Sequence, residues 1–303
     1  GLVELLIALV LSLVLTMGII EVFLGSKQAY RTQDALSRVQ ENGRFAMEEL
    51  SRNIRMAGFQ GCGSLDVVNT NVLASSLPGS STFSAQDAVR GYQYGSSSFN
   101  PTYVGSTEPS PLPGTDVISI SRADDCGDYL SAAMSTDNAL TVEGKCTFTS
   151  GDPVIITDCT SADLFMPIVT SGVNLAVDPT ANTSSRLSRL YGSDARVYRF
   201  LQLDYYIRQN SFGEPALFKR ENGVESELVE GVENFQVLYG EDTAGSDFFV
   251  DEYNTAPSIS GWDKVCSVRP VLSFRSKEGN ITLDNNPLRQ DMTSTIGIRN
   301  RLP

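Results

Sequence analysis

The hydrophobic positions at the start of this chain form one unbroken run. Residues 5–24 carry a single charged side chain, Glu21, and are otherwise almost entirely apolar. About 20 such residues span the hydrocarbon core of a bilayer when they are helical. The apolar core of a signal peptide is shorter, and no small-residue cleavage pattern follows this run. We therefore predict a transmembrane helix that stays in the mature protein.

Downstream of the run, apolar and small residues recur at steps of three and four. This stripe comprises Leu36, Val39, Gly43, Ala46, Leu50, Ile54 and Ala57. Its period is that of an amphipathic helix, and Arg44 is among the polar residues on the other faces. Glycines at 58, 61 and 63 are typical of a helix end. We predict one helix of about 58 residues, in which Leu36, Val39, Leu50 and Ile54 pack against a sheet.

The rest of the chain shows the pattern of strands and loops. Residues 69–114 are rich in Ser, Gly and Pro without a period, which predicts long surface loops. We expect Tyr92, Tyr94 and Tyr103 to hold these loops to the body, against the alternative of an interaction patch. Strands are expected at 116–122, 139–143, 152–158, 164–170, 197–209 and 265–276. Asn222-Gly223 predicts a further hairpin.

Together these elements predict an α+β fold with a long N-terminal helix packed on an antiparallel sheet that has long loops. The expected organisation is a hydrophobic helix half at 1–25, an amphipathic half at 26–58 and a β-rich globular domain at 59–303.

The composition argues against catalysis and against nucleic-acid binding. The chain has no histidine, which excludes catalytic triads and the common zinc and iron sites. We expect no enzyme, no cofactor and no metal. A net charge of -13 opposes binding to phosphates. A modest basic cluster comprises Arg186, Arg189, Arg196 and Arg199, and in so acidic a chain we expect it to pair with acidic neighbours.

Five cysteines without a CxxC pair are typical of an exported, disulfide-bonded domain. We expect at least one bridge among Cys62, Cys126, Cys146 and Cys159, against the alternative of buried free thiols. Cys146 and Cys159 are the nearest pair in the sequence. Cys62 bonded to Cys159 or to Cys126 would instead tie the helix end to the sheet, so the pairing stays open.

The opening GLVELLIALVL resembles the N-terminal signal region of type IV pilins and pseudopilins. In that family a prepilin peptidase removes a basic leader, and the new N-terminal residue is methylated. Glu4 stands one position before the place of the family's acid, so the resemblance implies that one mature residue and the leader precede this sequence.

The resemblance also gives Glu4 a role in subunit docking. It implies that Glu4 pairs with an N-terminal amine, its own or that of a neighbouring subunit, which would offset the cost of a carboxylate in apolar surroundings. The filament core or the membrane would then take up Leu5, Leu6, Leu9, Leu13 and Ile20. The alternative is a plain signal anchor with Glu4 among lipid head groups.

Several later segments resemble PilW-type minor pilins. They are RFAMEELSRNIRMAGFQGC, PLPGTDVISISRA, LDYYIRQNSFGEPALFKRENG, LVEGVENFQVLYG, the lone Trp262 before VCSVRPVLSFRS, and the ending IRNRLP. The resemblance implies a non-enzymatic subunit of a priming or tip complex that starts pilus assembly, with twitching motility and adhesion as outputs and DNA uptake left open. Implied partners are other minor pilins, the major pilin, a PilY-family tip adhesin and the prepilin peptidase.

The implied location is the inner membrane, crossed once and with a periplasmic domain, before assembly, and the pilus tip at the cell surface afterwards. Two alternatives remain open at this stage. One is a J-type pseudopilin of a type II secretion system, and the other is a membrane-anchored periplasmic binding protein.

Overall fold

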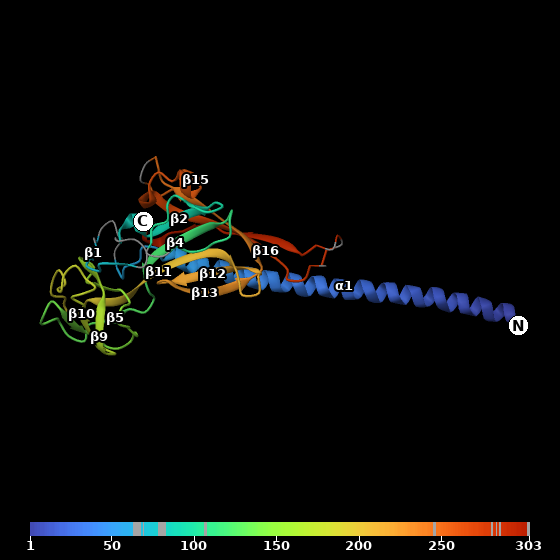
Figure 1. Ribbon diagram of the computed structural model, residues 1–303, viewed down its shortest axis with the longest axis horizontal. Coiled ribbons are helices and arrows are strands. Elements are labelled where there is room, and N and C mark those ends of the chain that lie inside the picture. The colour runs from blue at the N-terminus through green and yellow to red at the C-terminus, as the bar shows by residue number, and fades with distance from the viewer. Residues whose placement is uncertain are drawn as a thin grey trace.

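The computed structural model describes residues 1–62, 68, 70–77, 83–105, 108–244, 247–279, 281–282, 284 and 286–301. Gly63, Leu302 and Pro303, which belong to the predicted helix stop and to the PilW-like ending, lie outside this set. The chain begins with one continuous helix, α1 (Leu2–Arg55), that projects from a β-rich body (Figure 1). The helix ends slightly before the predicted residue 58, because the chain turns there and Gly58 adopts a φ of 73°.

The largest sheet has ten strands and is organised around β11 (Arg196–Gln209). Its other strands are β1 (Thr70–Val72), β2 (Val89–Tyr94), β3 (Phe99–Asn100), β4 (Asp116–Ala123), β5 (Asp128–Tyr129), β7 (Val154–Thr157), β8 (Ala162–Phe165), β12 (Pro215–Glu221) and β13 (Val224–Glu230). The first part of β11 pairs with β5 and β7, and the later part pairs with β4 and β12. One long strand therefore joins two parts of the body.

Two smaller sheets complete the body. A three-stranded sheet comprises β6 (Ala139–Thr141), β9 (Pro167–Ser171) and β10 (Asn174–Val177). A five-stranded sheet comprises β14 (Val232–Glu241), β15 (Glu252–Asn254), β16 (Val265–Arg275), β17 (Arg289–Thr293) and β18 (Ile296–Gly297). Short 3₁₀ turns lie at η1 (Ala85–Asp87), η2 (Ala256–Ser258), η3 (Trp262–Lys264) and η4 (Arg299–Arg301).

The α+β class, with a long N-terminal helix packed on largely antiparallel β-structure, is confirmed. In the described part of the chain the strands form three sheets, and β1 runs parallel to β8. The segment predicted as loops, residues 69–114, also contains strands, of which β2 is the longest. Apolar and polar side chains do not alternate regularly along β2, so the sequence pattern did not indicate a strand. It forms a strand because it pairs with β4. Residues 69, 78–82 and 106–107 of that segment lie outside the described set.

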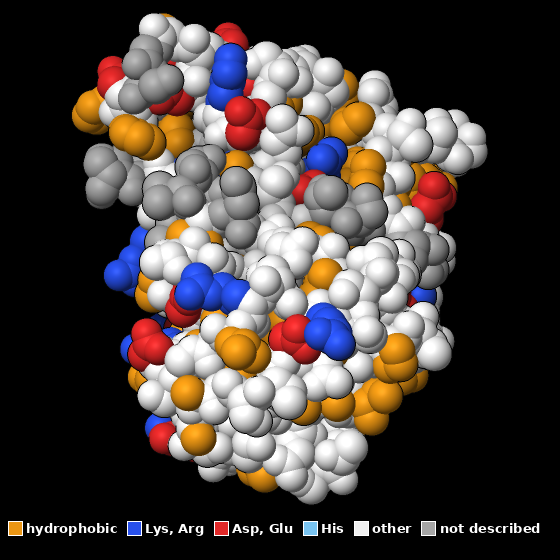
Figure 2. Space-filling model, turned by 90° about the vertical axis from the view of Figure 1, so that its left-hand side faces the viewer, with side chains coloured by type: hydrophobic (Ala, Val, Ile, Leu, Met, Phe, Trp, Pro, Cys, Tyr) orange, Lys and Arg blue, Asp and Glu red, His pale blue; other side chains and the backbone are white. Residues whose placement is uncertain are grey.

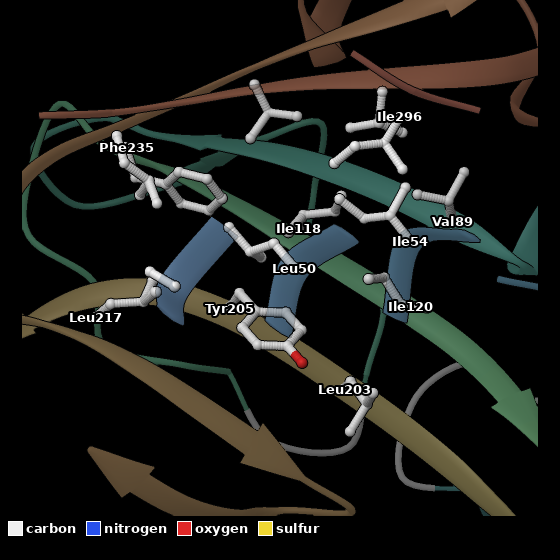
Figure 3. Close-up of a cluster of buried hydrophobic side chains, with 14 of the residues drawn as sticks. Leu50, Ile54, Val89, Ile118, Ile120, Leu203, Tyr205, Leu217, Phe235 and Ile296 are labelled. Atoms are coloured by element: carbon white, nitrogen blue, oxygen red, sulfur yellow. The ribbon is translucent and has the colours of Figure 1, made fainter. Parts of the chain in front are cut away.

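The main hydrophobic core lies where α1 meets the ten-stranded and five-stranded sheets. Leu50 and Ile54 of α1 are fully buried there, and Figure 3 shows them among side chains from several strands. Burying each such side chain contributes about 1.5–3 kcal/mol. Gly43 lets α1 approach β17 closely, because a Cβ at this position would lie 2.1 Å from Met292 Sδ.

A second hydrophobic core fills the part of the molecule farthest from the N-terminus (Figure 1). We call residues 124–199 the distal lobe. Its core contains Val154, Ile156, Phe165 and Val197, all with no exposed surface. The distal lobe therefore has its own packing and is joined to the rest of the body through β4 and β11.

Candidate assembly surfaces

The first half of α1 is an uncovered apolar surface. Every residue from 1 to 27 is exposed in the structure as described, and the first anchor is Gln28, whose Nε2 donates to the Ile281 carbonyl at 2.8 Å. The predicted core residues Leu5, Leu6, Leu9, Leu13 and Ile20 are 51–63% exposed. The helix is long and apolar enough to cross a membrane. Since so large an apolar surface is unstable in water, it requires lipid or other helices as a cover.

Glu4 lies in the first turn of this uncovered half. Its carboxylate contacts the amino group of Gly1, and its side chain is 84% exposed. A negative charge is favourable near a helix N-terminus because it complements the helix dipole. The carboxylate is thus accessible to a neighbouring molecule, while all the side chains around it in the sequence are apolar.

The second half of α1 is fixed to the body through its apolar stripe. Val39, Leu50 and Ile54 are buried, and Leu36 is half-buried at the margin. Arg44 points to solvent, as a residue of the polar face should. The strands that α1 contacts include β13, β16, β17 and β18. A rigid body is therefore attached directly to the uncovered helix half.

A polar residue that the stripe did not predict is buried on the same face of α1. Asn53 donates to the Tyr205 hydroxyl at 2.7 Å and accepts a hydrogen bond from Arg122 Nε at 3.1 Å. Because both the amide and the guanidinium are almost fully buried, these bonds offset the cost of removing them from water. They tie the end of α1 to β4 and β11. The only feature of the sequence that could have indicated the burial of Asn53 is its position next to Ile54 of the apolar stripe.

These side chains border a polar cleft of about 350 Å³ between α1, β4, β11 and β12. In it, Asp125 forms ion pairs with both Arg52 and Arg122. Partial burial raises the pKa of Asp125, but the two guanidinium groups outweigh burial and hold the pKa below its ordinary value. For Asp124, burial raises the pKa above the ordinary value despite a 2.8 Å ion pair with Arg199.

The charges of the cleft are thus largely paired with one another. Within the described residues, no group of three or more His, Cys, Asp or Glu side chains is arranged to hold a metal ion. The arrangement serves to join α1 to the body.

The four arginines of the basic cluster form ion pairs and one aromatic contact within the distal lobe and at its boundary. The contacts are Arg186 with Asp137 at 3.3 Å, Arg189 with Asp158 at 3.2 Å, Arg199 with Asp124 at 2.8 Å, and the Arg196 guanidinium 4.9 Å from the centre of the Tyr129 ring. The expected pairing with acidic neighbours is confirmed for three of the four arginines.

Two disulfides hold the distal lobe. Cys62, which follows α1, is bonded to Cys159, and Cys126 is bonded to Cys146. The expectation of at least one disulfide is confirmed. Of the pairings left open by the sequence, Cys62 with Cys159 is formed, whereas Cys146 with Cys159 and Cys62 with Cys126 are not. Strand β7 pairs with β8 and β11 rather than with the segment around Cys146, so Cys159 turns toward the end of α1 instead.

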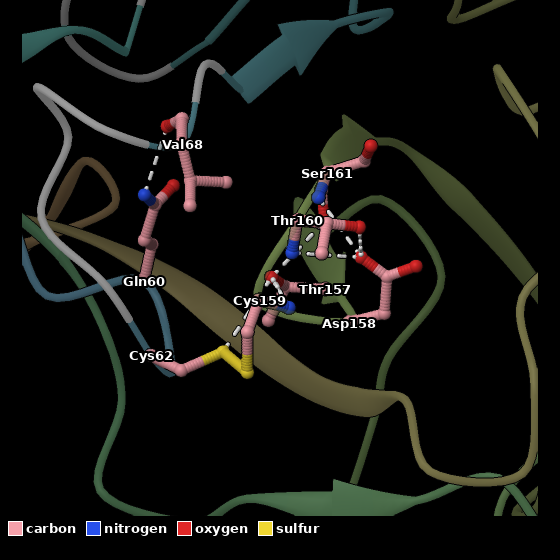
Figure 4. Close-up of a disulfide and its surroundings, with 8 residues drawn as sticks. All are labelled: Gln60, Cys62, Val68, Thr157, Asp158, Cys159, Thr160 and Ser161. Carbon is pink, nitrogen blue, oxygen red and sulfur yellow. Dashed lines mark hydrogen bonds between the residues drawn. A yellow bond between two sulfur atoms is a disulfide. The ribbon is translucent and has the colours of Figure 1, made fainter.

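The surroundings of the first disulfide show how Cys159 is positioned (Figure 4). Cys159 lies in the turn between β7 and β8 with a φ of 69°. Asp158 Oδ1 holds this turn by accepting the backbone N–H groups of Thr160 at 3.0 Å and Ser161 at 2.9 Å. The Cys62–Cys159 disulfide therefore attaches the segment that follows α1 to the distal lobe. Cys266 is buried as a free thiol.

Comparison with known proteins gives one family match. Residues 204–297, about a third of the chain, match the family model of PilW, type IV pilus-assembly protein W. The matched region covers the later part of β11, the β12–β13 hairpin and the five-stranded sheet, which are the elements packed around α1. No curated protein and no solved structure matches the chain. The match confirms the resemblance to the PilW family and links the chain to type IV pilus assembly.

Proposed function

We propose that this chain is a minor pilin that joins a priming or tip complex with other minor pilins and so initiates type IV pilus assembly. The observation that carries the proposal is the division of α1. Residues 1–27 are all exposed and mostly apolar, while the second half of α1 packs into the body. Such a helix sits in the membrane before assembly and exchanges lipid contacts for contacts with other apolar helices in the filament.

Within this function, Glu4 sets the axial register of docking. Its carboxylate is the only side-chain charge between residues 1 and 20. In apolar surroundings an unpaired carboxylate is costly, so docking is favourable where an N-terminal amine of a neighbouring subunit reaches it. A slip of one residue displaces the carboxylate by about 1.5 Å along the axis and rotates it around the helix. Register is therefore selected by this ion pair.

The two disulfides support a periplasmic location for the body, because disulfides form and persist in oxidising compartments. The distal lobe lies at the opposite end of the molecule from the helix N-terminus (Figure 1). When α1 is in the filament core, the distal lobe is the part farthest along the axis. This orientation suits a subunit at the pilus tip, where it would meet a PilY-family adhesin.

The test compares two acids of the same apolar helix half in cells that lack the native gene. Glu4→Ala and Glu4→Gln should insert into the membrane normally, yet fail to recover partner minor pilins and fail to restore surface pili. Glu21→Ala is the matched control and should restore both. The measurements are membrane fractionation, pull-down of the minor pilins and counts of pili by electron microscopy.

Wild-type recovery of partners and pili by both Glu4 variants would show that Glu4 has no docking role. If deletion of the gene leaves pilus number unchanged and abolishes protein secretion, the chain is a pseudopilin instead. Loss of pili together with loss of twitching, restored by the wild-type gene, is the result that we expect.

A further inference from the structure

The loop between β14 and β15 presents two adjacent aromatic side chains to solvent. Phe249 is 74% exposed and Phe248 is 46% exposed. In the end-on view of Figure 2, hydrophobic and acidic side chains, with a lysine or arginine side chain beside them, lie at the top of the molecule, the side on which β15 lies in Figure 1. Adjacent exposed phenylalanines on a soluble body are a feature of interaction sites rather than of ordinary surface.

Carboxylates of the loop itself hold its backbone in place. Asp242 accepts the N–H of Phe248 at 2.8 Å, and Asp247 accepts that of Phe249 at 3.1 Å. Phe248 has a φ of 66°, a left-handed conformation that is uncommon for a bulky residue and persists only where the surroundings impose it. The two rings are therefore carried by a turn whose backbone is fixed by hydrogen bonds.

The base of the loop is also fixed. Val250 packs on β14 at Gly240, where a Cβ would lie 2.8 Å from Val250 Cγ1. Asp251 accepts the N–H groups of Thr243 at 2.7 Å and Ala244 at 2.8 Å. Backbone hydrogen bonds to Asp251 lower its pKa, so this carboxylate stays charged. One apolar side chain is thus turned inward while the two before it face out.

The sequence of this region is acidic, although Lys264 follows it directly and the Arg269 guanidinium lies 3.9 Å from the centre of the Tyr253 ring on β15. Residues 242–263 contain five acidic residues and no lysine or arginine. The strand that follows the loop, β15, is the edge strand of its sheet. An anionic membrane surface would repel such a loop. A second copy of this chain is a poor partner too, because its net charge is -13.

We propose that Phe248 and Phe249 form a docking knob for another protein subunit, one with an apolar pocket rimmed by lysine or arginine. Phe249 enters the pocket, and the acidic residues around it face the basic rim. An aromatic anchor surrounded by complementary charge is the usual composition of an interface hot spot. This contact is separate from docking through α1 and extends the proposed function to the body of the molecule.

The partner is identified first, in the cells that make the full chain. A photo-reactive phenylalanine analogue replaces Phe249, and the control carries it at Phe212, an 85% exposed phenylalanine in the β11–β12 turn. We expect position 249 to cross-link to one peptide of another protein, with lysine or arginine next to apolar residues, and position 212 not to do so. Cross-links only to lipid or to a second copy of this chain, or none at all, would overturn the proposal.

The second step measures recovery of that cross-linked protein with full-length variants. Phe249→Ser should lower recovery at least tenfold, and Glu252→Lys, which reverses an exposed charge without touching the loop backbone, should lower it several-fold. Phe212→Ser should leave recovery unchanged. Because all three side chains are exposed, the melting temperatures should equal that of the wild type. Equal recovery by the Phe249 and Phe212 variants would refute the knob, whereas failure of the Glu4 test alone would refute only the helix-docking role.

Discussion

Asp116 provides a quantitative test of how the two larger sheets are joined. It lies on β4 with 4% of its surface exposed, and its carboxylate accepts the backbone N–H of Val237, on β14, at 2.8 Å. Burial raises its pKa from 3.8 to about 6, against the smaller lowering effect of this hydrogen bond. The carboxyl group is therefore held in a place where its charged form is unfavourable.

The direction of the pH effect follows from this shift. Because the folded pKa is raised, the contribution of Asp116 to stability is fully present below pH 3.8 and is lost as the pH rises through about 6. A shift of about two pH units corresponds to about 3 kcal/mol. An asparagine in place of Asp116 would stay neutral at every pH, and its side-chain oxygen could still accept the Val237 N–H. Asp116→Asn should thus raise the free energy of unfolding by about 3 kcal/mol at pH 7.5 and by almost nothing near pH 4.

The assay is urea unfolding at both pH values, followed by circular dichroism. A chain that begins at Gln28 is suitable, because every residue from 1 to 27 is exposed and the first anchor to the body is Gln28. Asp251→Asn is the control, since Asp251 is exposed and its pKa is lowered; it should give no gain in stability at pH 7.5. Equal midpoints for Asp116→Asn and the wild type at pH 7.5, or a difference that does not shrink at low pH, would refute the reasoning.

Two further predictions concern the packing of α1 and the disulfides. Leu50→Asp places an unpaired charge in the main core and should lower the free energy of unfolding by about 4 kcal/mol or more, whereas Arg44→Ala on the exposed face should cost less than about 0.5 kcal/mol; equal urea midpoints would mean that the buried face of α1 is misassigned. The Cys62–Cys159 bridge closes a separation of 97 residues and Cys126–Cys146 one of 20, so replacing the first pair by serine should cost about 5 kcal/mol and the second about 3 kcal/mol. A larger loss of stability for the second pair would contradict this order. Five free thiols in exported protein, measured by non-reducing mass spectrometry, would show that neither disulfide forms.

Local patterns in the sequence were sufficient to predict α1 and the β12–β13 hairpin. The long apolar run and the stripe through Leu50 and Ile54 specify a helix and its buried face, because a helix side repeats every 3.6 residues whatever it packs against. Asn222 and Gly223 have φ values of 47° and 89°, as the predicted tight turn between β12 and β13 requires. These features depend on residues close together in the chain.

Other features were decided by contacts between residues far apart in the sequence. Strand β11 divides its partners between two parts of the body, so nothing local to residues 196–209 could show that it links the distal lobe to the main core. The burial of Asn53 beside Arg122 and the raised pKa of Asp116 arise in the same way, from a helix and strands that meet only after folding.

The disulfides also show the difference between what the sequence indicates and what only the fold decides. Nearness in the sequence favoured Cys146 with Cys159, yet strand pairing brings Cys159 to Cys62. Composition indicated that bridges exist, because cysteines in an exported domain tend to be oxidised. Only the path of the chain selected the partners, since a disulfide forms between cysteines whose Cβ atoms the fold places close together and in a suitable orientation.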